Sequence, residues 1–304
     1  MSKRLVWIFT ASRSEYGLME PVINEMNKSH TLIAKKQFIE PSFTIGEIAE
    51  YVEDELKLGK PDIAIVPCDR REMVPVAMAC FFNNVPTIHY YAGTYSFSGT
   101  HDDVSRHVIS MFSHIMCCES EAARQILIKG GEEEWRVVVS GGSHFDDIKI
   151  DMDLCPKEPY NLFLLLPEHY GDNNKMISKA VKELDTNKLV VVIAPNEDKE
   201  SEKLWKKMKW YLMGHRTTVF ESLPRPQFLG LMKKCDKFVS NSSSTLFEAP
   251  YLGAKVFNPS IRNSIRTLPN INNLMGGSKF LSSLCEVIDI NDPKLLMKKV
   301  REYP

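Results

Sequence analysis

Long hydrophobic runs are missing from this sequence of 304 residues. No segment reaches the roughly 18 apolar residues that a membrane-spanning helix needs. The first residues, Met1 to Arg4, precede an apolar stretch too short for the hydrophobic region of a signal peptide. Internal repeats and low-complexity tracts are missing as well. We therefore expect a cytoplasmic globular protein without a membrane partner, long enough for two domains with hydrophobic cores.

Cysteine is scarce and irregularly placed. The seven cysteines include no Cys-x-x-Cys pair, which is the spacing that zinc sites and redox motifs commonly use. An odd number of scattered thiols does not suit a disulfide framework either. The sequence therefore predicts reduced cysteines, no metal site and no bound cofactor, with Cys117 and Cys118 in a buried strand.

Net charge is small, but it is unevenly distributed. The formal net charge is −1, whereas residues 1–150 contain 15 basic and 21 acidic side chains and residues 151–304 contain 23 and 18. The most basic stretch, Lys203 to Tyr211, mixes lysines with aromatic residues and predicts a helix with one cationic side. Such a side is usually only solvated, and the alternative is an anionic partner such as nucleic acid.

Short apolar runs alternate with polar turns and helical patterns along the chain. Continuous apolar runs are typical of strands buried on both faces, and such strands alternating with helices form parallel sheets. The sequence therefore predicts an α/β fold with two Rossmann-like parallel-sheet domains, residues 1–154 and 155–304, and the last helix can pack back on the N-terminal domain. A ligand is expected in the cleft between the domains, at the carboxyl ends of the strands. The expected strands are residues 5–9, 62–66, 85–90, 136–139, 162–166, 189–193, 217–220, 237–239 and 255–257.

A serine-rich segment, Ser240 to Pro250, follows one of these strands. It places short hydroxyls and one carboxylate before a helical pattern that begins at Leu246. Free N–H groups at a helix start bind phosphate, and a carboxylate about one turn later can accept hydrogen bonds from both ribose hydroxyls. The segment predicts a nucleoside diphosphate site, with an ordinary capping serine as the alternative. The candidate residues are Ser242, Ser243, Ser244 and Glu248.

Three further polar clusters follow predicted strands of the N-terminal half. Arg13 lies in the first loop, and Asp69 with Arg70 follows the strand at 62–66, where a cation can meet a phosphate or sugar. The third cluster, Ser98 to His107, contains two aspartates, two histidines and an arginine. Aspartates before a helix are often only caps, but all three loops open at one sheet edge, which favours a shared site. The candidates of the third cluster are Asp102, Asp103, Arg106 and His107.

With these residues in view, the chain resembles the hydrolysing UDP-N-acetylglucosamine 2-epimerase family of the sialic-acid pathways, whose members have the GT-B fold. The matching segments extend nearly from end to end and are specific as an ordered set. They are Thr10 to Gly17, Asp69-Arg70 with Glu72, Ser98 to His107, Ser222 to Pro224, and Asn241 to Pro250.

The resemblance assigns these candidates to two parts of a UDP-sugar site. It implies that the serine-rich loop and the glutamate after it hold the nucleotide, and that the loops of the N-terminal half line the sugar and phosphate. The nucleotide residues are Ser243, Ser244 and Glu248; the sugar-phosphate residues are Arg13, Asp69, Arg70, Asp102, Asp103, Arg106 and His107.

Two acid/base positions of the family differ in this chain. Where the family has Gly-Gly-Glu, this chain has Ala92-Gly93-Thr94 followed by two extra residues, so we expect one active-site carboxylate to be absent. A family histidine before a proline aligns with Leu166, and the nearest substitute is His169; Glu168 or His169 could replace the missing groups if either reaches the cleft. Epimerisation at C2 needs several acid/base groups, and the loss of one typically costs about two to four orders of magnitude in rate.

These departures favour a UDP-sugar-dependent glycosyltransferase. Transfer to an acceptor hydroxyl needs one base, here Asp69 or Asp103, together with groups that stabilise departing UDP. The acceptor could be anionic, including a hydroxylated base in DNA. The first alternative is a hydrolysing UDP-N-acetylglucosamine 2-epimerase, and the other is a nucleotide-sugar-binding protein without turnover. A homodimer is the default oligomer. The predicted catalytic residues are Asp69, Asp103, His107 and His169.

Overall fold

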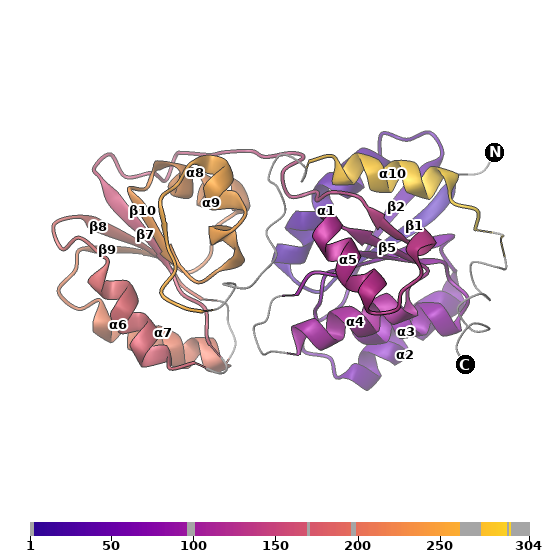
Figure 1. The fold of residues 1–304 in the computed structure, drawn as a ribbon, viewed down its shortest axis with the longest axis horizontal. Helices are drawn as coiled ribbons and strands as arrows, with labels where there is room; N and C mark the ends of the chain where they lie inside the picture. The colour runs from indigo at the N-terminus through magenta and orange to yellow at the C-terminus, as the bar shows by residue number, and fades with distance from the viewer. Residues whose placement is uncertain are drawn as a thin grey trace. The chain divides into compact units, whose positions relative to one another are not determined.

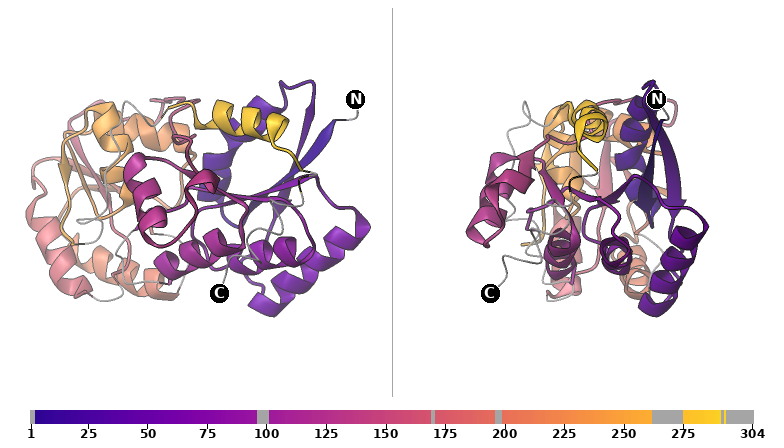
Figure 2. Two further views of the ribbon diagram at one scale, coloured as in Figure 1. Left: turned by 45° about the vertical axis from the view of Figure 1, so that its right-hand side comes forward. Right: turned by 90° about the vertical axis from the view of Figure 1, so that its right-hand side faces the viewer.

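The computed structural model describes residues 3–95, 101–168, 171–195, 199–261, 275–290 and 292. These residues form two compact units, each built on a parallel sheet (Figures 1 and 2). The first unit contains the residues up to Tyr95, then His101–Asp147 and the helix near the C-terminus; the second begins at Ile148. The predicted α/β class with two Rossmann-like parallel sheets is confirmed.

The sheet of the first unit has the strand order β2-β1-β3-β4-β5-β6, and every neighbouring pair is parallel. Its inner strands are mostly apolar because both of their faces are covered. The elements in chain order are β1 (Arg4–Thr10), α1 (Arg13–Met26), β2 (Leu32–Phe38), α2 (Ile45–Leu58), β3 (Ile63–Pro67), α3 (Met73–Phe82), β4 (Thr87–Tyr90), α4 (Asp102–Phe112), β5 (Ile115–Cys118), α5 (Glu121–Lys129), η1 (Glu134–Arg136), β6 (Val137–Val139) and α10 (Gly277–Val287).

Helices cover both faces of this first sheet. α1 and α10 pack on one face, where Met19 and Leu281 are fully buried, and α2 and α3 pack on the other, where Ile48 is fully buried. In Figure 1 these two helix pairs lie on opposite sides of the strands. A Cβ on Gly277 would lie 2.2 Å from the Tyr90 Oη. Glycine therefore lets the start of α10 approach the end of β4.

The sheet of the second unit has the order β11-β10-β7-β8-β9 and is parallel throughout. α6 and α7 contribute to the core on one face, and α8 and α9 contribute to the core on the other. The elements are β7 (Tyr160–Leu164), α6 (Asn173–Lys182), β8 (Leu189–Ile193), α7 (Lys199–Tyr211), β9 (Thr217–Phe220), α8 (Arg225–Lys234), β10 (Lys237–Ser240), η2 (Ser243–Thr245), α9 (Glu248–Leu252) and β11 (Val256–Phe257).

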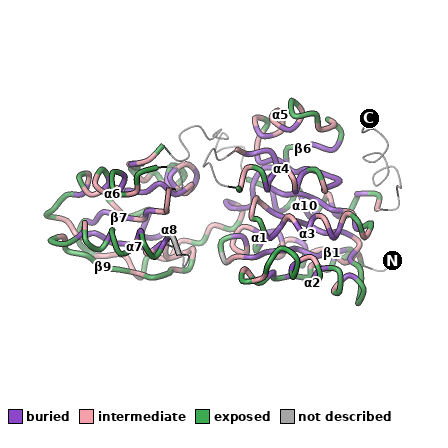
Figure 3. Tube along the Cα trace, turned by 90° about the horizontal axis from the view of Figure 1, so that it is seen from below, coloured by how far each residue is buried: buried purple, intermediate pink, exposed green. Residues whose placement is uncertain are grey.

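Burial follows these layers: in Figure 3 most inner strands are buried, while the outer sides of the helices are exposed. The strands expected from the apolar runs are confirmed within a few residues, and Cys117 and Cys118 lie in β5 as predicted. β2 was not expected, because exposed lysines interrupt it. None of the described helices combines the length and hydrophobicity that crossing a bilayer requires.

Candidate active site

Polar side chains gather at the carboxyl edge of the first sheet. All strands of a parallel sheet end at the same edge, so the loops after neighbouring strands lie side by side there. The segments that follow β1, β3, β4 and β5 each contribute at least one polar side chain. These are Glu15 after β1; Asp69, Arg70 and Glu72 after β3; Thr94 after β4; and Glu119 after β5.

The turn after β3 fixes the direction in which Asp69 leaves the sheet. Cys68 has a φ of 62°, a left-handed conformation that costs a residue with a side chain about 1–3 kcal/mol. Its N–H donates to the Tyr90 carbonyl oxygen at 2.8 Å, and its own carbonyl oxygen accepts from Nε2 of buried His89 at 2.8 Å. His89 Nδ1 lies 2.8 Å from the Ser110 Oγ. These hydrogen bonds hold the strained turn and therefore position Asp69.

Asp69 is paired with Arg106 of α4. Arg106 is only 3% exposed; its Nη2 donates to the Asp69 Oδ2, and its Nη1 donates to the Tyr91 carbonyl oxygen. The Asp69 side chain keeps 24% of its surface exposed. Since hydrogen bonds from a guanidinium orient a carboxylate, this pair holds Asp69 in place and still leaves it accessible to a ligand. Two predicted site residues that are 37 positions apart are thus brought together.

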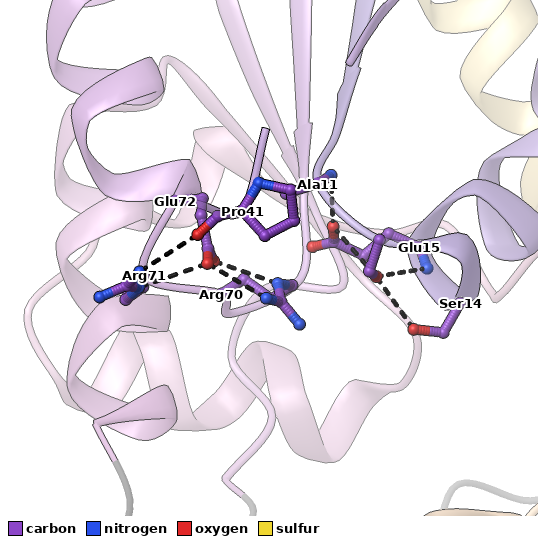
Figure 4. A network of polar contacts seen from close by, with 8 residues as sticks. Ala11, Ser14, Glu15, Pro41, Arg70, Arg71 and Glu72 are labelled. Carbon is purple, nitrogen blue, oxygen red and sulfur yellow. Dashed lines mark hydrogen bonds and ion pairs between the residues drawn. The ribbon is translucent and has the colours of Figure 1, made fainter. Parts of the chain in front are cut away.

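Arg70 is held by Glu72 rather than by Asp69. Figure 4 shows the Arg70 guanidinium facing the buried Glu72 carboxylate, to which its Nε and Nη2 each donate at 3.1 Å. Arg71 Nε donates to the same carboxylate at 3.3 Å. Burial raises the pKa of Glu72, but the hydrogen bonds from the arginines outweigh burial and lower the pKa below its ordinary value. Arg70 is therefore a positioned cation at this edge.

Glu15 is a buried carboxyl group beside these residues, on the first turn of α1 (Figure 4). Its Oε2 accepts the N–H of Ala11 at 2.7 Å, while its buried Oε1 has no hydrogen-bond partner among the described residues. Burial raises the pKa of Glu15 to about 7, although the Ala11 N–H and the Arg70 charge oppose this shift. Near neutral pH this group can therefore either give or take a proton. The sequence-based candidates did not include it.

Glu15 is expected to make stability depend on pH. Its pKa rises from 4.5 in the unfolded chain to about 7 in the fold, so the folded protein binds this proton more tightly. The stabilisation is complete below the lower pKa and is lost as the pH rises through the higher one. The free energy of unfolding, measured in urea, should fall between about pH 5.5 and 7.5. We expect this fall to be about 2 kcal/mol larger in the wild type than in Glu15→Gln. Equal slopes for the two proteins would mean that the Glu15 pKa is not raised.

The start of α4 carries the remaining candidates of the first unit. Asp102 and Asp103 lie in its first turn, and His107 lies one turn later. Burial and the charge of Arg106 lower the pKa of His107, and Asp103 opposes them. The His107 ring lies 4.7 Å from the Tyr95 ring, and its buried Nε2 has no hydrogen-bond partner in the part of the chain that is described. Burial and the nearby Arg106 charge therefore disfavour the protonated form of His107.

Thr94 occupies the position where the sequence led us to expect a missing carboxylate. A carboxylate does lie beside it: the Thr94 hydroxyl donates to the Glu119 Oε1 at 3.1 Å, and both residues are 3% exposed. Glu119 directly follows β5 and precedes Ser120, the N-cap of α5. It was missed because a glutamate before a capping serine is a common surface pattern. Only the fold shows that it is buried next to Thr94.

The serine-rich loop lies at the carboxyl end of β10 in the second unit. The helix expected from Leu246 begins two residues later, at Glu248, as the short helix α9, and a 3-10 turn, η2, precedes it. The Ser244 N–H donates to the Ser242 Oγ at 3.3 Å, and the Thr245 Oγ1 donates to the Ser242 carbonyl oxygen at 2.6 Å. Side-chain bonds of this kind compete with a regular helix, which explains the 3-10 turn. Ser243 and Ser244 stay partly exposed, whereas Ser242 is buried and its hydroxyl caps the turn.

Two contacts fix the surroundings of this loop. Asn241, fully buried, bonds both backbone groups of Leu166, accepting its N–H at 2.7 Å and donating to its carbonyl oxygen at 2.8 Å. Glu248 is partly buried and lies 3.5 Å from Arg225 Nη2. The loops after β7 and β10 are therefore joined, with a carboxylate and a guanidinium nearby. Arg225 was not among the predicted residues.

Some predicted residues are not placed. His169 and the segment Ser98 to Thr100 lie outside the described residues, as does the side chain of Arg13, with which α1 begins. Glu168, considered as a substitute for a missing group, accepts a hydrogen bond from Ser260 Oγ within its own unit. In the described ranges no three His, Cys, Asp or Glu side chains are arranged to hold a metal ion.

The chain is similar to known proteins over most of its length. A family model described as UDP-N-acetylglucosamine 2-epimerase matches residues 3–265. A UDP-N,N'-diacetylbacillosamine 2-epimerase (hydrolyzing) from Legionella pneumophila is 24% identical over 88% of this chain and 83% of its own length. A GDP/UDP-N,N'-diacetylbacillosamine 2-epimerase (hydrolyzing) from Campylobacter jejuni is 26% identical over 85% of this chain and 80% of its own length.

Among solved structures, the UDP-GlcNAc 2-epimerase of Neisseria meningitidis bound to UDP-GlcNAc has a similar fold. Its TM-score is 0.75, with 20% sequence identity over 97% of this chain and 93% of that chain. The GT-B fold implied by the sequence resemblance is thereby confirmed.

Proposed function

Because the chain belongs to the UDP-N-acetylglucosamine 2-epimerase family, we propose that it is a hydrolysing 2-epimerase acting on a UDP-activated 2-acetamido sugar. The names of its relatives supply the substrate class, which includes UDP-GlcNAc and UDP-N,N'-diacetylbacillosamine. The glycosyltransferase function that the sequence departures favoured is not confirmed, and the epimerase alternative fits the findings better. The anionic acceptor and the homodimer stay predictions.

One observation carries the proposal: several acid/base groups share one sheet edge. Asp69, Glu15 and Glu119 follow three different strands of the first unit, and Arg106 contacts Asp69 directly. Glycosyl transfer needs a single base for the acceptor hydroxyl, whereas inversion at C2 needs groups that remove and return protons. The number of titratable side chains at this edge therefore favours epimerisation over transfer.

The proposed reaction consumes one UDP-sugar and one water. A base takes the C2 proton, the C1–O bond breaks, and UDP leaves with the bonding electron pair, which forms a glycal. Water oxygen then bonds to C1, and a proton adds to C2 from the face opposite to the one that lost it. The products are UDP and the free sugar inverted at C2. Asp69 is the proposed base for the first step, since its ion pair with Arg106 holds it as an oriented carboxylate.

The remaining candidates have supporting roles in this proposal. The cationic side chains stabilise the charge that develops on departing UDP, and the second unit holds the nucleotide through its serine hydroxyls and Glu248. Asp103 and His107 stay predicted acid/base residues near Arg106. The stabilising cations of the first unit are Arg13, Arg70 and Arg106.

The direct test is NMR of purified protein with UDP-GlcNAc, and separately with UDP-N,N'-diacetylbacillosamine, in deuterated water. We expect release of UDP and of a free sugar that is inverted and deuterated at C2. A UDP-sugar that binds but stays intact would exclude hydrolytic epimerisation of that substrate. If the UDP-sugar is consumed only after an acceptor is added, and no deuterium appears at C2, the glycosyltransferase function would be favoured again.

Glu248 is expected to contribute to nucleotide affinity. If its carboxylate accepts the ribose hydroxyls, Glu248→Ala removes hydrogen bonds to a charged acceptor and should weaken UDP binding by roughly 1.5–3 kcal/mol. Isothermal titration calorimetry with UDP measures this directly. Glu202→Ala on α7, where the side chain is exposed, is the matched control and should bind UDP normally. Wild-type affinity in Glu248→Ala would remove the ribose assignment.

A further inference from the structure

Glu119 is a buried carboxylate that the mechanism above leaves without a role. Its carboxylate accepts the Thr94 hydroxyl at 3.1 Å and forms no ion pair with a described residue. Burying a carboxylate costs several kcal/mol unless charge or hydrogen bonds compensate. The Thr94 hydroxyl supplies a hydrogen bond and Arg106 supplies a nearby charge, so this buried carboxyl group is surrounded by groups of the candidate site itself. Its presence therefore points to a chemical role.

The surroundings of Glu119 belong to the candidate site. Arg106, Cys68 and Tyr91 all lie within its electrostatic influence. Arg106 in turn contacts Asp69 and the Tyr91 carbonyl oxygen. Glu119 and Asp69 are thus two carboxylates near a single buried guanidinium, one after β5 and one after β3.

The strand order sets the spacing between the two backbone loops that carry these carboxylates. β4 lies between β3 and β5, so the two loops leave the sheet about 9–10 Å apart. A sugar ring with one acid/base group against each face needs a separation of this order. Inversion at C2 has this requirement, because the proton leaves from one face and returns to the other. Glu15, after β1, lies on the other side of β3 and cannot complete such a pair with Asp69.

We propose that Glu119 is the second acid/base residue of the reaction, and that the Thr94 hydroxyl orients it; this rests on the proposed function. Asp69 takes the C2 proton as UDP leaves with the C1–O electron pair. Glu119 then gives a proton to C2 of the glycal from the opposite face. Water oxygen bonds to C1, and the proton that this water releases returns to Glu119. Asp69 passes its proton to solvent, which balances the reaction.

The proposal makes a specific product prediction for Glu119→Gln. Glutamine keeps the size of the side chain and an oxygen for the Thr94 hydroxyl, but it cannot deliver a proton. Formation of the inverted sugar should fall about 100-fold, while Asp69 continues to eliminate UDP. NMR should therefore show UDP release together with an accumulating glycal. Adding Thr94→Glu to Glu119→Gln introduces a carboxylate next to position 119. This double variant should form the inverted sugar at least about tenfold faster than Glu119→Gln alone.

The control is Glu121→Gln, two residues away, whose exposed side chain pairs with Arg124; it should leave rate and products unchanged. Wild-type rate and products in Glu119→Gln would overturn the proposal. Loss of UDP release together with lower stability in urea, and no glycal, would assign Glu119 a structural role and also overturn it. A wild-type protein that neither releases UDP nor labels C2 would instead overturn the proposed function, and this inference with it.

Discussion

Asp69→Asn should lower kcat for release of UDP from a UDP-2-acetamido sugar by about three orders of magnitude. Asparagine has nearly the same shape and can still accept a hydrogen bond from Arg106, but it cannot take the C2 proton. Affinity for UDP should not change, because the proposed nucleotide residues lie in the second unit. The measurement combines kcat, C2 deuterium incorporation and UDP titration on the same preparation.

Two comparisons make the Asp69 result interpretable. Asp54→Asn alters an exposed carboxylate of α2 that pairs with Lys57, so it should retain full activity. Circular dichroism shows whether the Asp69 variant is folded at the assay temperature. A folded Asp69→Asn protein with kcat within about tenfold of wild type would contradict its role as a base. Another carboxyl group at the same edge, first of all Glu15, would then be the candidate.

Much of the fold could be predicted because the strands buried on both faces are continuous apolar runs. The exception, β2, is an edge strand in which Lys35 and Lys36 interrupt the pattern. β2 pairs with β1 in parallel along its whole length, and this backbone pairing does not require an apolar pattern in β2. An exposed polar strand of this kind carries little signal in a single sequence.

Part of the candidate site could be predicted, because some of its residues stand out in the sequence pattern. Asp69 was predicted because it follows a strand, and Arg106 because it lies in a dense polar cluster. Their ion pair could not be predicted, because it depends on how α4 packs. Glu15 follows a capping serine, Ser12, so its pattern indicates a helix start rather than a titratable group. Its raised pKa arises from burial, which the sequence around it does not reveal. The same holds for Glu119.

Arg106→Met is expected to destabilise the protein by about 3 kcal/mol. The methionine has a similar length but no charge, so it leaves the Asp69 carboxylate without its cation and the Tyr91 carbonyl oxygen without its donor. Breaking a buried ion pair by removing one partner typically costs about 3–5 kcal/mol. We expect the lower value because Asp69 is partly exposed. Urea unfolding followed by circular dichroism measures the change.

A second replacement separates the charge from the packing. If the cost arises from the uncompensated Asp69 carboxylate, then adding Asp69→Leu to Arg106→Met should restore much of the lost stability, because neither partner is left charged. That double variant should remain inactive, since it has no base. Lys57→Met, which removes an exposed partner of Asp54 on α2, should unfold like wild type. If the double variant is no more stable than Arg106→Met, the guanidinium contributes through packing and through the Tyr91 hydrogen bond. In that case the Asp69–Arg106 charge pair orients the base without stabilising the fold.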